Sequence, residues 1–458
     1  MTVARRIVVP HTFHPRPWWV AVGLIVLMDV IIATPAHAAS GDLAWHRAFN
    51  GTGDGQDTFS ALALAPKGGV YVVGTTFAAN YDFVAARYTR AGQRRWLRNY
   101  DGPGDGLDEA VAAAASPDGA LVEAGYVTMT DMSLAMAVIK YDPAGHARWI
   151  RTSSLRTGFP DNPLTIAVDR KGNVYVAGTR ETTTTSYDVA VIKYAPSGAH
   201  RWSRLYVGPG ADIPTDVALD GRGNVYVTGY SYQGLTRDYD ALSLSYDPRG
   251  HRRWVRLWDG GATDTAGAVA VTRGGAVFVA GSTATTTSGQ DALLLKYSSH
   301  GALRWSRTYT GAGAQTDSYG GVVALGNGDV AVAGASYSST SALDALVARY
   351  SPSGGRRWVE LYDDPDKGGD QVWTIARDRT GAIYAAGQTY APGTSWDSLA
   401  LSYSGTGVLR WARSYSSAGS ATDTARAIAL VSGKSVYVAG TQAGANLSDD
   451  GVLLRYKP

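Results

Sequence analysis

The fold is decided by residues 165–206, which read TIAVDRKGNVYVAGTRETTTTSYDVAVIKYAPSGAHRWSRLY. This stretch contains four short runs with alternating apolar positions and many β-branched or aromatic residues, at 165–169, 173–178, 188–194 and 200–206. Gly, Pro, Asn and Asp separate the runs. The pattern predicts four strands joined by turns.

The same pattern is repeated eight times. Trp202 of the quoted stretch has equivalents at intervals of 51 to 53 residues: Trp45, Trp96, Trp149, Trp254, Trp305, Trp358 and Trp411. A period of this length, filled with strand signals, is typical of a β-propeller in which each repeat forms one blade. We therefore expect an all-β fold over residues 39–458, a single eight-bladed propeller with four antiparallel strands per blade.

The two ends of the repeat array complement each other. The region starts with one fourth-type strand around Trp45 and finishes with three strands that end at Tyr456. Joining them would complete the eighth blade from one N-terminal and three C-terminal strands and would leave no open sheet edge.

Residues 1–38 have the features of a secretory signal. Arg5, Arg6 and Arg16 precede or flank an apolar run at 18–33, and small residues at 36–38 (AHA) supply a cleavage site. These features predict a cleaved signal peptide, with a membrane anchor as the alternative. We expect a secreted or extracytoplasmic protein with no membrane insertion after cleavage.

Charge and cysteine content exclude some classes of function. The 458-residue chain has a net charge of +3, and removal of residues 1–38 leaves about +1. This balance does not favour nucleic acid as a partner. The chain has no cysteine, so it forms no disulfide or thiolate metal site. We expect a monomer that meets a polysaccharide or a protein at the cell surface.

One aspartate recurs in every copy, 17 residues before the glycine that ends the second strand. A ring of carboxylates near the mouth of the channel would suit a hard cation such as calcium. The alternative, which we favour, is that each carboxylate fastens its own glycine-rich turn through backbone hydrogen bonds, with no cofactor. These residues are Asp57, Asp108, Asp161, Asp212, Asp264, Asp317, Asp370 and Asp423.

Aromatic residues gather in the connections between the second and third strands. These connections, like those that lead from the fourth strand to the next repeat, are longer and more variable than the other two, and variable loops on a rigid scaffold often carry recognition. Aromatic rings beside hydroxyl groups suit sugar stacking or a protein partner, and ordinary loop packing is the alternative. The candidate ligand-binding residues are Tyr81, Tyr126, Tyr187, Tyr232, Tyr239, Tyr337, Tyr390 and Trp396.

Catalytic motifs are missing from the sequence. It contains no HExxH zinc motif and no GxSxG nucleophile elbow. We therefore expect a non-catalytic binding or scaffold module. A propeller enzyme, either a polysaccharide lyase or hydrolase or a quinoprotein-like oxidoreductase, is the alternative.

The repeat resembles a known family. The GNVYVAG wording at 172–178, followed by a D…KY strand and then G…RW, is similar to the beta-propeller repeat of secreted bacterial proteins (SBBP). This resemblance implies export and a propeller fold without an established activity. The glycine four residues before each tryptophan is also similar to the pyrroloquinoline quinone repeat of eight-bladed quinoproteins. The adjacent cysteines of many such enzymes have no counterpart here.

Overall fold

The computed structural model describes residues 41–53, 55–153, 161–182, 186–234, 238–284, 289–312, 315–337, 343–365, 368–391, 395–417, 422–431, 433–444 and 448–458. Of residues 161–164, 186 and 391 it describes the backbone alone. The predicted signal peptide at 1–38 lies outside the described residues. In the part of the chain that is described, no helix is long and apolar enough to cross a membrane.

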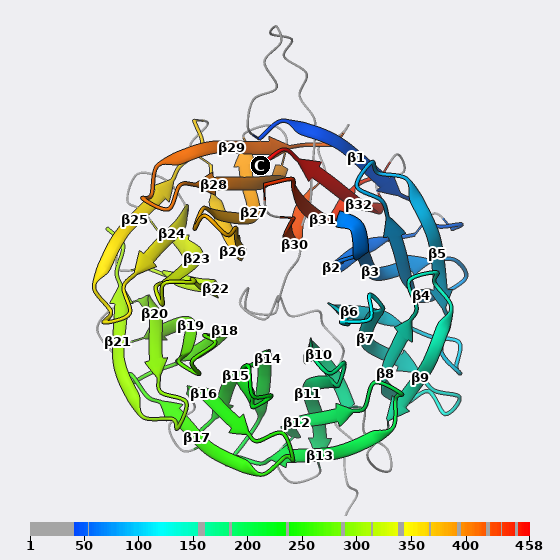
Figure 1. Ribbon diagram of the computed structural model, residues 1–458, viewed down its shortest axis with the longest axis horizontal. Helices are drawn as coiled ribbons and strands as arrows, with labels where there is room; N and C mark the ends of the chain where they lie inside the picture. Colours follow the sequence, from blue (N-terminus) through cyan, green and yellow to red (C-terminus); the bar gives the residue numbers. More distant parts are fainter. Residues whose placement is uncertain are drawn as a thin grey trace, which may run out of the picture.

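The described chain forms eight four-stranded antiparallel sheets arranged in a ring (Figure 1). We call the strands of each sheet A to D from the centre outward. The first four blades consist of β2 (Thr58–Leu64), β3 (Val70–Phe77), β4 (Tyr81–Tyr88) and β5 (Arg94–Tyr100); β6 (Glu109–Ala115), β7 (Leu121–Thr128), β8 (Leu134–Tyr141) and β9 (Ala147–Ser153); β10 (Asp161–Val168), β11 (Val174–Thr182), β12 (Ser186–Tyr194) and β13 (His200–Tyr206); and β14 (Asp212–Leu219), β15 (Val225–Tyr232), β16 (Tyr239–Tyr246) and β17 (Arg252–Trp258).

The next three blades follow the same order, and the eighth differs only in the origin of its outer strand. They consist of β18 (Thr265–Val271), β19 (Val277–Ala284), β20 (Gln290–Tyr297) and β21 (Leu303–Tyr309); β22 (Ser318–Ala324), β23 (Val330–Ser336), β24 (Asp344–Tyr350) and β25 (Arg356–Tyr362); β26 (Asp370–Arg377), β27 (Ile383–Ala391), β28 (Ser395–Tyr403) and β29 (Leu409–Tyr415); and β30 (Thr424–Val431), β31 (Ser435–Ala443), β32 (Asp449–Tyr456) and β1 (Leu43–Phe49).

The ring closes through the N-terminal strand. β1 pairs antiparallel with β32, from Leu43 opposite Tyr456 to Phe49 opposite Gly451, and the two strands lie side by side in Figure 1. The prediction of eight blades closed by one N-terminal and three C-terminal strands is confirmed.

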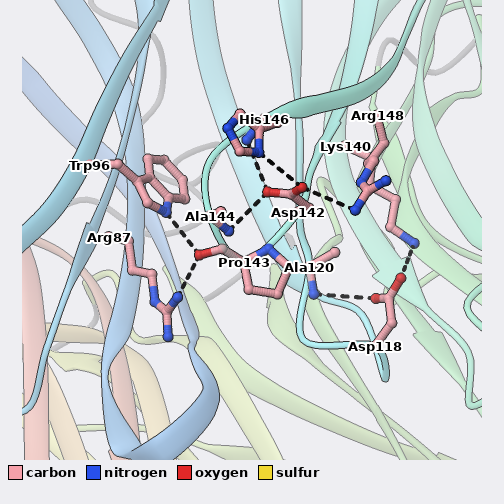
Figure 2. A network of polar contacts seen from close by, with 10 residues as sticks. All are labelled: Arg87, Trp96, Asp118, Ala120, Lys140, Asp142, Pro143, Ala144, His146 and Arg148. Carbon is pink, nitrogen blue, oxygen red and sulfur yellow. Dashed lines mark hydrogen bonds and ion pairs between the residues drawn. The ribbon is translucent and has the colours of Figure 1, made fainter.

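Neighbouring blades are joined by the repeated tryptophan. Trp96 on β5 donates its indole N–H to the carbonyl of Pro143 in the β8–β9 turn of the next blade, at 3.2 Å. Figure 2 shows the Arg87 guanidinium donating to the same carbonyl, while Asp142 accepts backbone hydrogen bonds from Ala144 and His146 within the turn. The turn is thus held from inside its own blade and from the blade before it.

Glycine makes this approach possible. Gly145 follows Pro143 in the turn and has a φ of +88°, and a Cβ there would lie 2.7 Å from Cδ2 of Trp96. The last tryptophan, Trp411, meets Gly41 in the same way, because a Cβ at Gly41 would lie 2.6 Å from its Cγ. The same contact therefore closes the ring between the two ends of the chain.

Candidate binding site at the mouth of the channel

The central channel contains a cavity of about 640 Å³. Residues of all eight innermost strands border it, and these strands surround the centre in Figure 1. The cavity also reaches residues of the B–C and D–A connections, so it opens at the face of the ring that carries the longer loops. We call this side the loop face and the side of the short A–B and C–D turns the turn face.

A β-bulge in each innermost strand determines what enters the cavity. The pairing of strand A with strand B skips one residue in every blade, and an extra residue of this kind re-aims its side chain. The skipped residues are Ser60, Val111, Leu164, Thr215, Gly267, Gly320, Trp373 and Arg426. Of the seven whose side chains are described, six border the cavity and Thr215 does not; the side chain of Leu164 lies outside the described residues. The skipped residues range from glycine to tryptophan and arginine, so the side chains around the cavity have no eightfold symmetry.

Trp373 is the largest of these side chains. Its indole N–H donates to the carbonyl of Ala425 in the next blade at 2.8 Å, which fixes the orientation of the ring. The preceding blade makes room for it with two glycines: a Cβ at Gly320 would lie 2.9 Å from Cβ of Trp373, and one at Gly321 would lie 2.8 Å from the Trp373 carbonyl oxygen. The indole is half-buried and borders the cavity.

Arg426 occupies the bulge of the neighbouring blade, next in sequence to the carbonyl that holds Trp373. Its Nε is buried and has no hydrogen-bond partner among the described residues. Burial lowers the pKa of Arg426 to about 9, while the carboxylates of Glu109 and Asp449 act in the opposite direction. The guanidinium is therefore still protonated at neutral pH.

Asp216 is the acidic side chain among the described residues that border the cavity. Its oxygens accept the backbone N–H of Val217 at 2.8 Å and that of Val269 in the next blade at 2.9 Å. Burial raises the pKa of Asp216 to about 6, and these two hydrogen bonds oppose the shift. Asp216 therefore connects the innermost strands β14 and β18.

Two of the eight predicted aromatic residues reach this cavity. Trp396 and Tyr337 border it from the loop face, together with Gln315 and Gln371. The carbonyl of Trp396 accepts the backbone N–H of Asp423 in the next blade, which holds the start of β28 in place.

The other predicted aromatics lie in separate hairpins. Tyr232 and Tyr239 contact each other in the fourth blade, Tyr81 packs against Phe77 in the first, and the Tyr126 hydroxyl donates to Glu109 in the second. Tyr187 and Tyr390 are 40% and 41% exposed. Tyr390 packs edge-on against Trp396. The structure therefore spreads these side chains around the ring instead of gathering them in one patch.

The recurring aspartates whose side chains are described are buried between blades and do not border the cavity. Seven have described side chains, and all seven are fully buried; the side chain of Asp161 lies outside the described residues. Asp423 is representative, because its carboxylate accepts the backbone N–H groups of Ser417 at 2.5 Å and Ala443 at 2.8 Å. Equivalent bonds from the preceding loop reach Asp57, Asp108, Asp212, Asp264, Asp317 and Asp370.

The pKa values of these buried carboxyl groups are raised. Burial raises the pKa of Asp212 to about 6 and those of Asp370 and Asp423 to about 7, and the backbone hydrogen bonds only partly oppose it. The backbone N–H of Asp423 bonds to the carbonyl of Trp396 in the preceding blade, and those of five other recurring aspartates make the equivalent bond, so these residues connect the D–A loop to two blades.

Two acidic triads stand out among the described residues. Asp82, Asp101 and Asp108 bring one carboxylate oxygen each within 4.8 Å of one another, and so do Asp240, Asp259 and Asp264 at the equivalent junction of the fourth and fifth blades. A cation held by the recurring aspartates would use these triads, because the recurring set has no common centre at the cavity. Sequence reasoning missed Asp101 and Asp259, although each is an aspartate directly after strand D, a position held by Asn50, Val207 and Thr310 in other blades.

The turn-face end of the channel is lined by basic residues. A hollow of about 870 Å³ on the turn face is bordered by basic side chains of the A–B turns, among them Arg170, Lys171, Arg222 and Arg273. Arg377, at the turn-face end of β26, also borders it and donates through Nε to the carbonyl of Ala324.

Comparison with known proteins agrees with the repeat pattern. Residues 201–235 match the family model of the SBBP beta-propeller repeat. The chain carries an SBBP repeat. The resemblance predicted from the sequence is confirmed, and the matched segment starts at the residue before Trp202.

Other likenesses are more distant. A segment of 122 residues is 27% identical to an uncharacterized WD repeat-containing protein, L264, of Acanthamoeba polyphaga mimivirus, covering 22% of this chain and 9% of that protein. The chain thus spans less than a tenth of this relative.

Solved propellers are similar at low identity. The WD40 domain of SCAP from fission yeast has 9% identity and a TM-score of 0.45, with 88% of this chain and 95% of that chain covered. Puromycin hydrolase has 12% identity and a TM-score of 0.48, with 88% and 61% covered. Neither likeness bears on the function of this chain.

Proposed function

We propose that this protein is a non-catalytic binding module, exported through cleavage of residues 1–38, that receives part of an extracellular polysaccharide in the channel cavity on its loop face. The observation that carries the proposal is the cavity itself, in which Trp373 and Trp396 lie with the amides of Gln315 and Gln371. Aromatic faces bind the apolar side of a sugar ring, and amides satisfy its hydroxyl groups.

The cavity residues support binding more than hydrolysis. Glycoside hydrolysis ordinarily uses two carboxyl groups on opposite sides of the scissile bond. Among the described residues that border the cavity, Asp216 is the single carboxyl, and both of its oxygens accept backbone hydrogen bonds. A hydrolase or lyase using carboxylates of the recurring set would have to act at fully buried side chains outside the cavity.

The proposal is tested by a binding panel. The mature protein, residues 39–458, is titrated with soluble polysaccharides, and the variants Trp373→Ala and Trp396→Ala are compared with Tyr187→Ala. Tyr187 is an exposed aromatic that does not border the cavity. Loss of affinity by about tenfold in the first two variants alone is expected. Equal losses in all three, or binding that survives both tryptophan variants, would contradict the proposal.

A further inference from the structure

Arg426 is the one basic side chain among the described residues that border the channel cavity. The β-bulge between Ala425 and Ala427 puts it there, at a position held by Ser60 and Val111 in the first two blades. A buried guanidinium group has five N–H donors and needs acceptors for them. The Nε of Arg426 has none within the described structure.

The nearby acids have partners of their own. Glu109 accepts a hydrogen bond from the hydroxyl of Tyr126, and Asp449 accepts one from the side-chain amide of Gln56 at 3.4 Å. Asp216 is held by the two backbone N–H groups already described. A guanidinium in a partly dry cavity gains most from an anion that brings both charge and in-plane acceptors, and a carboxylate provides both.

The single positive charge also limits the kind of anion. A phosphate monoester carries close to two negative charges at neutral pH, and its binding sites commonly combine several donors or cations. Here one guanidinium faces a cavity whose other described lining residues are neutral apart from Asp216. A monoanionic group matches this arrangement best.

Trp373 supplies the second part of the site. Its indole is anchored to Ala425, the residue next to Arg426, so a flat or ring-shaped group stacked on it would lie beside the guanidinium. Gly320 and Gly267 carry no side chain at the corresponding bulges of the two preceding blades, which leaves space in the cavity on the side of Trp373 away from Arg426.

We propose that the ligand of the channel cavity is an acidic sugar, with Arg426 receiving the carboxylate of a uronic acid unit while Trp373 stacks against its ring. This inference rests on the proposed function, which it makes more specific. It assigns recognition to two bulge residues of adjacent blades and predicts discrimination between charged and neutral forms of one saccharide.

The test uses trigalacturonic acid and its methyl ester, which share the same sugar units and differ in the charge and methylation of the carboxyl groups. Both are titrated by calorimetry into the mature wild-type protein and into Arg426→Gln, Arg426→Lys and Arg377→Gln. Arg377 is the matched control, because it is an innermost-strand arginine on the turn face. We expect the wild type and Arg377→Gln to prefer the acid by about tenfold or more. Arg426→Gln should lose that preference, and Arg426→Lys should keep part of it.

Two results would overturn the inference while leaving the proposed function intact: equal affinity of the wild type for acid and ester, or an unchanged preference in Arg426→Gln. If neither trisaccharide binds, benzoate tests the carboxylate site by itself. A melting temperature raised by benzoate in the wild type and not in Arg426→Gln would keep the carboxylate site and overturn a uronic acid as its ligand. No response to benzoate would overturn the carboxylate site as well, and the polysaccharide panel decides the proposed function separately.

Discussion

Trp96 and Gly145, on adjacent blades, are in contact at a distance that no other residue at position 145 would allow. The indole covers the glycine, whose φ of +88° also disfavours any side chain. All eight indoles of the repeat meet a glycine of the next blade. The tryptophans that reveal the fold therefore also hold neighbouring blades together.

The first prediction concerns this contact. Gly145→Ala should destabilise the protein by about 2–4 kcal/mol, because it combines left-handed backbone strain with displacement of a buried indole. Gly234→Ala is the control: Gly234 has a φ of +77° with no atom within 4 Å of its Cβ position, so strain alone should cost about 1 kcal/mol. Urea unfolding of both variants measures the difference. Equal losses would show that the indole contact contributes nothing.

A second prediction concerns the buried Glu123 on β7. Burial raises the pKa of its carboxyl group to about 8, and a hydrogen bond with the side chain of Tyr141 only partly opposes this shift. Val72 and Val176 hold this position in the first and third blades. Glu123→Val should stabilise the protein by about 1–3 kcal/mol, since it removes a buried polar group.

The gain from Glu123→Val should depend on pH. The folded pKa lies above the ordinary value of 4.5, so the folded state loses stability as pH rises from 4.5 through 8. The variant should therefore gain more at pH 9 than at pH 5 in parallel unfolding experiments. A gain that is the same at both pH values would contradict the assignment.

The third prediction concerns the whole molecule. Burial raises the pKa of Asp212 and Asp216 to about 6 and of Asp370 and Asp423 to about 7, from an ordinary 3.8. These carboxyls bind protons more tightly when folded, so their contribution to stability is present below pH 3.8 and is lost as pH rises through 6 to 7. Thermal melting should occur about 5 °C higher at pH 5 than at pH 7.5. A higher melting temperature at pH 7.5 would contradict this account.

The fourth prediction concerns calcium. The recurring carboxylates already accept backbone hydrogen bonds, so calcium in place of a chelator should change the melting temperature by less than about 1 °C. A rise of several degrees would contradict the interpretation that these aspartates only hold their own turns through backbone hydrogen bonds. The variants Asp101→Asn and Asp259→Asn would then show whether the two triads hold the ion. Asp105→Asn is the control, because Asp105 is an exposed aspartate in the same loop as Asp101.

The sequence predicted the ring well because the repeat is read directly from spacing. The tryptophan period, the strand signals and the incomplete ends together determine blade number and closure, and the structure agrees with all three.

The candidate site was harder to predict because it depends on the bulge. The aromatic pattern of the B–C loops predicted Trp396 and Tyr337. It did not predict Trp373 and Arg426, because these two lie on innermost strands. A bulge shifts the alternation of side chains by one residue, so periodicity alone does not show which of them faces the channel. The available signal was variation: the bulge position reads Ser, Val, Leu, Thr, Gly, Gly, Trp and Arg across the eight blades.

The most direct test of the central claim, that the channel cavity holds the ligand, is calorimetric titration of Gly267→Val with the polysaccharide that the wild type binds best. Gly267 borders the cavity, and a Cβ there would meet nothing closer than 3.4 Å; Val111 fills the same bulge in the second blade. Narrowing the cavity at Gly267 should weaken binding by about tenfold or more while the melting temperature stays within about 2 °C of the wild type. Full affinity in a folded Gly267→Val protein would place the ligand elsewhere.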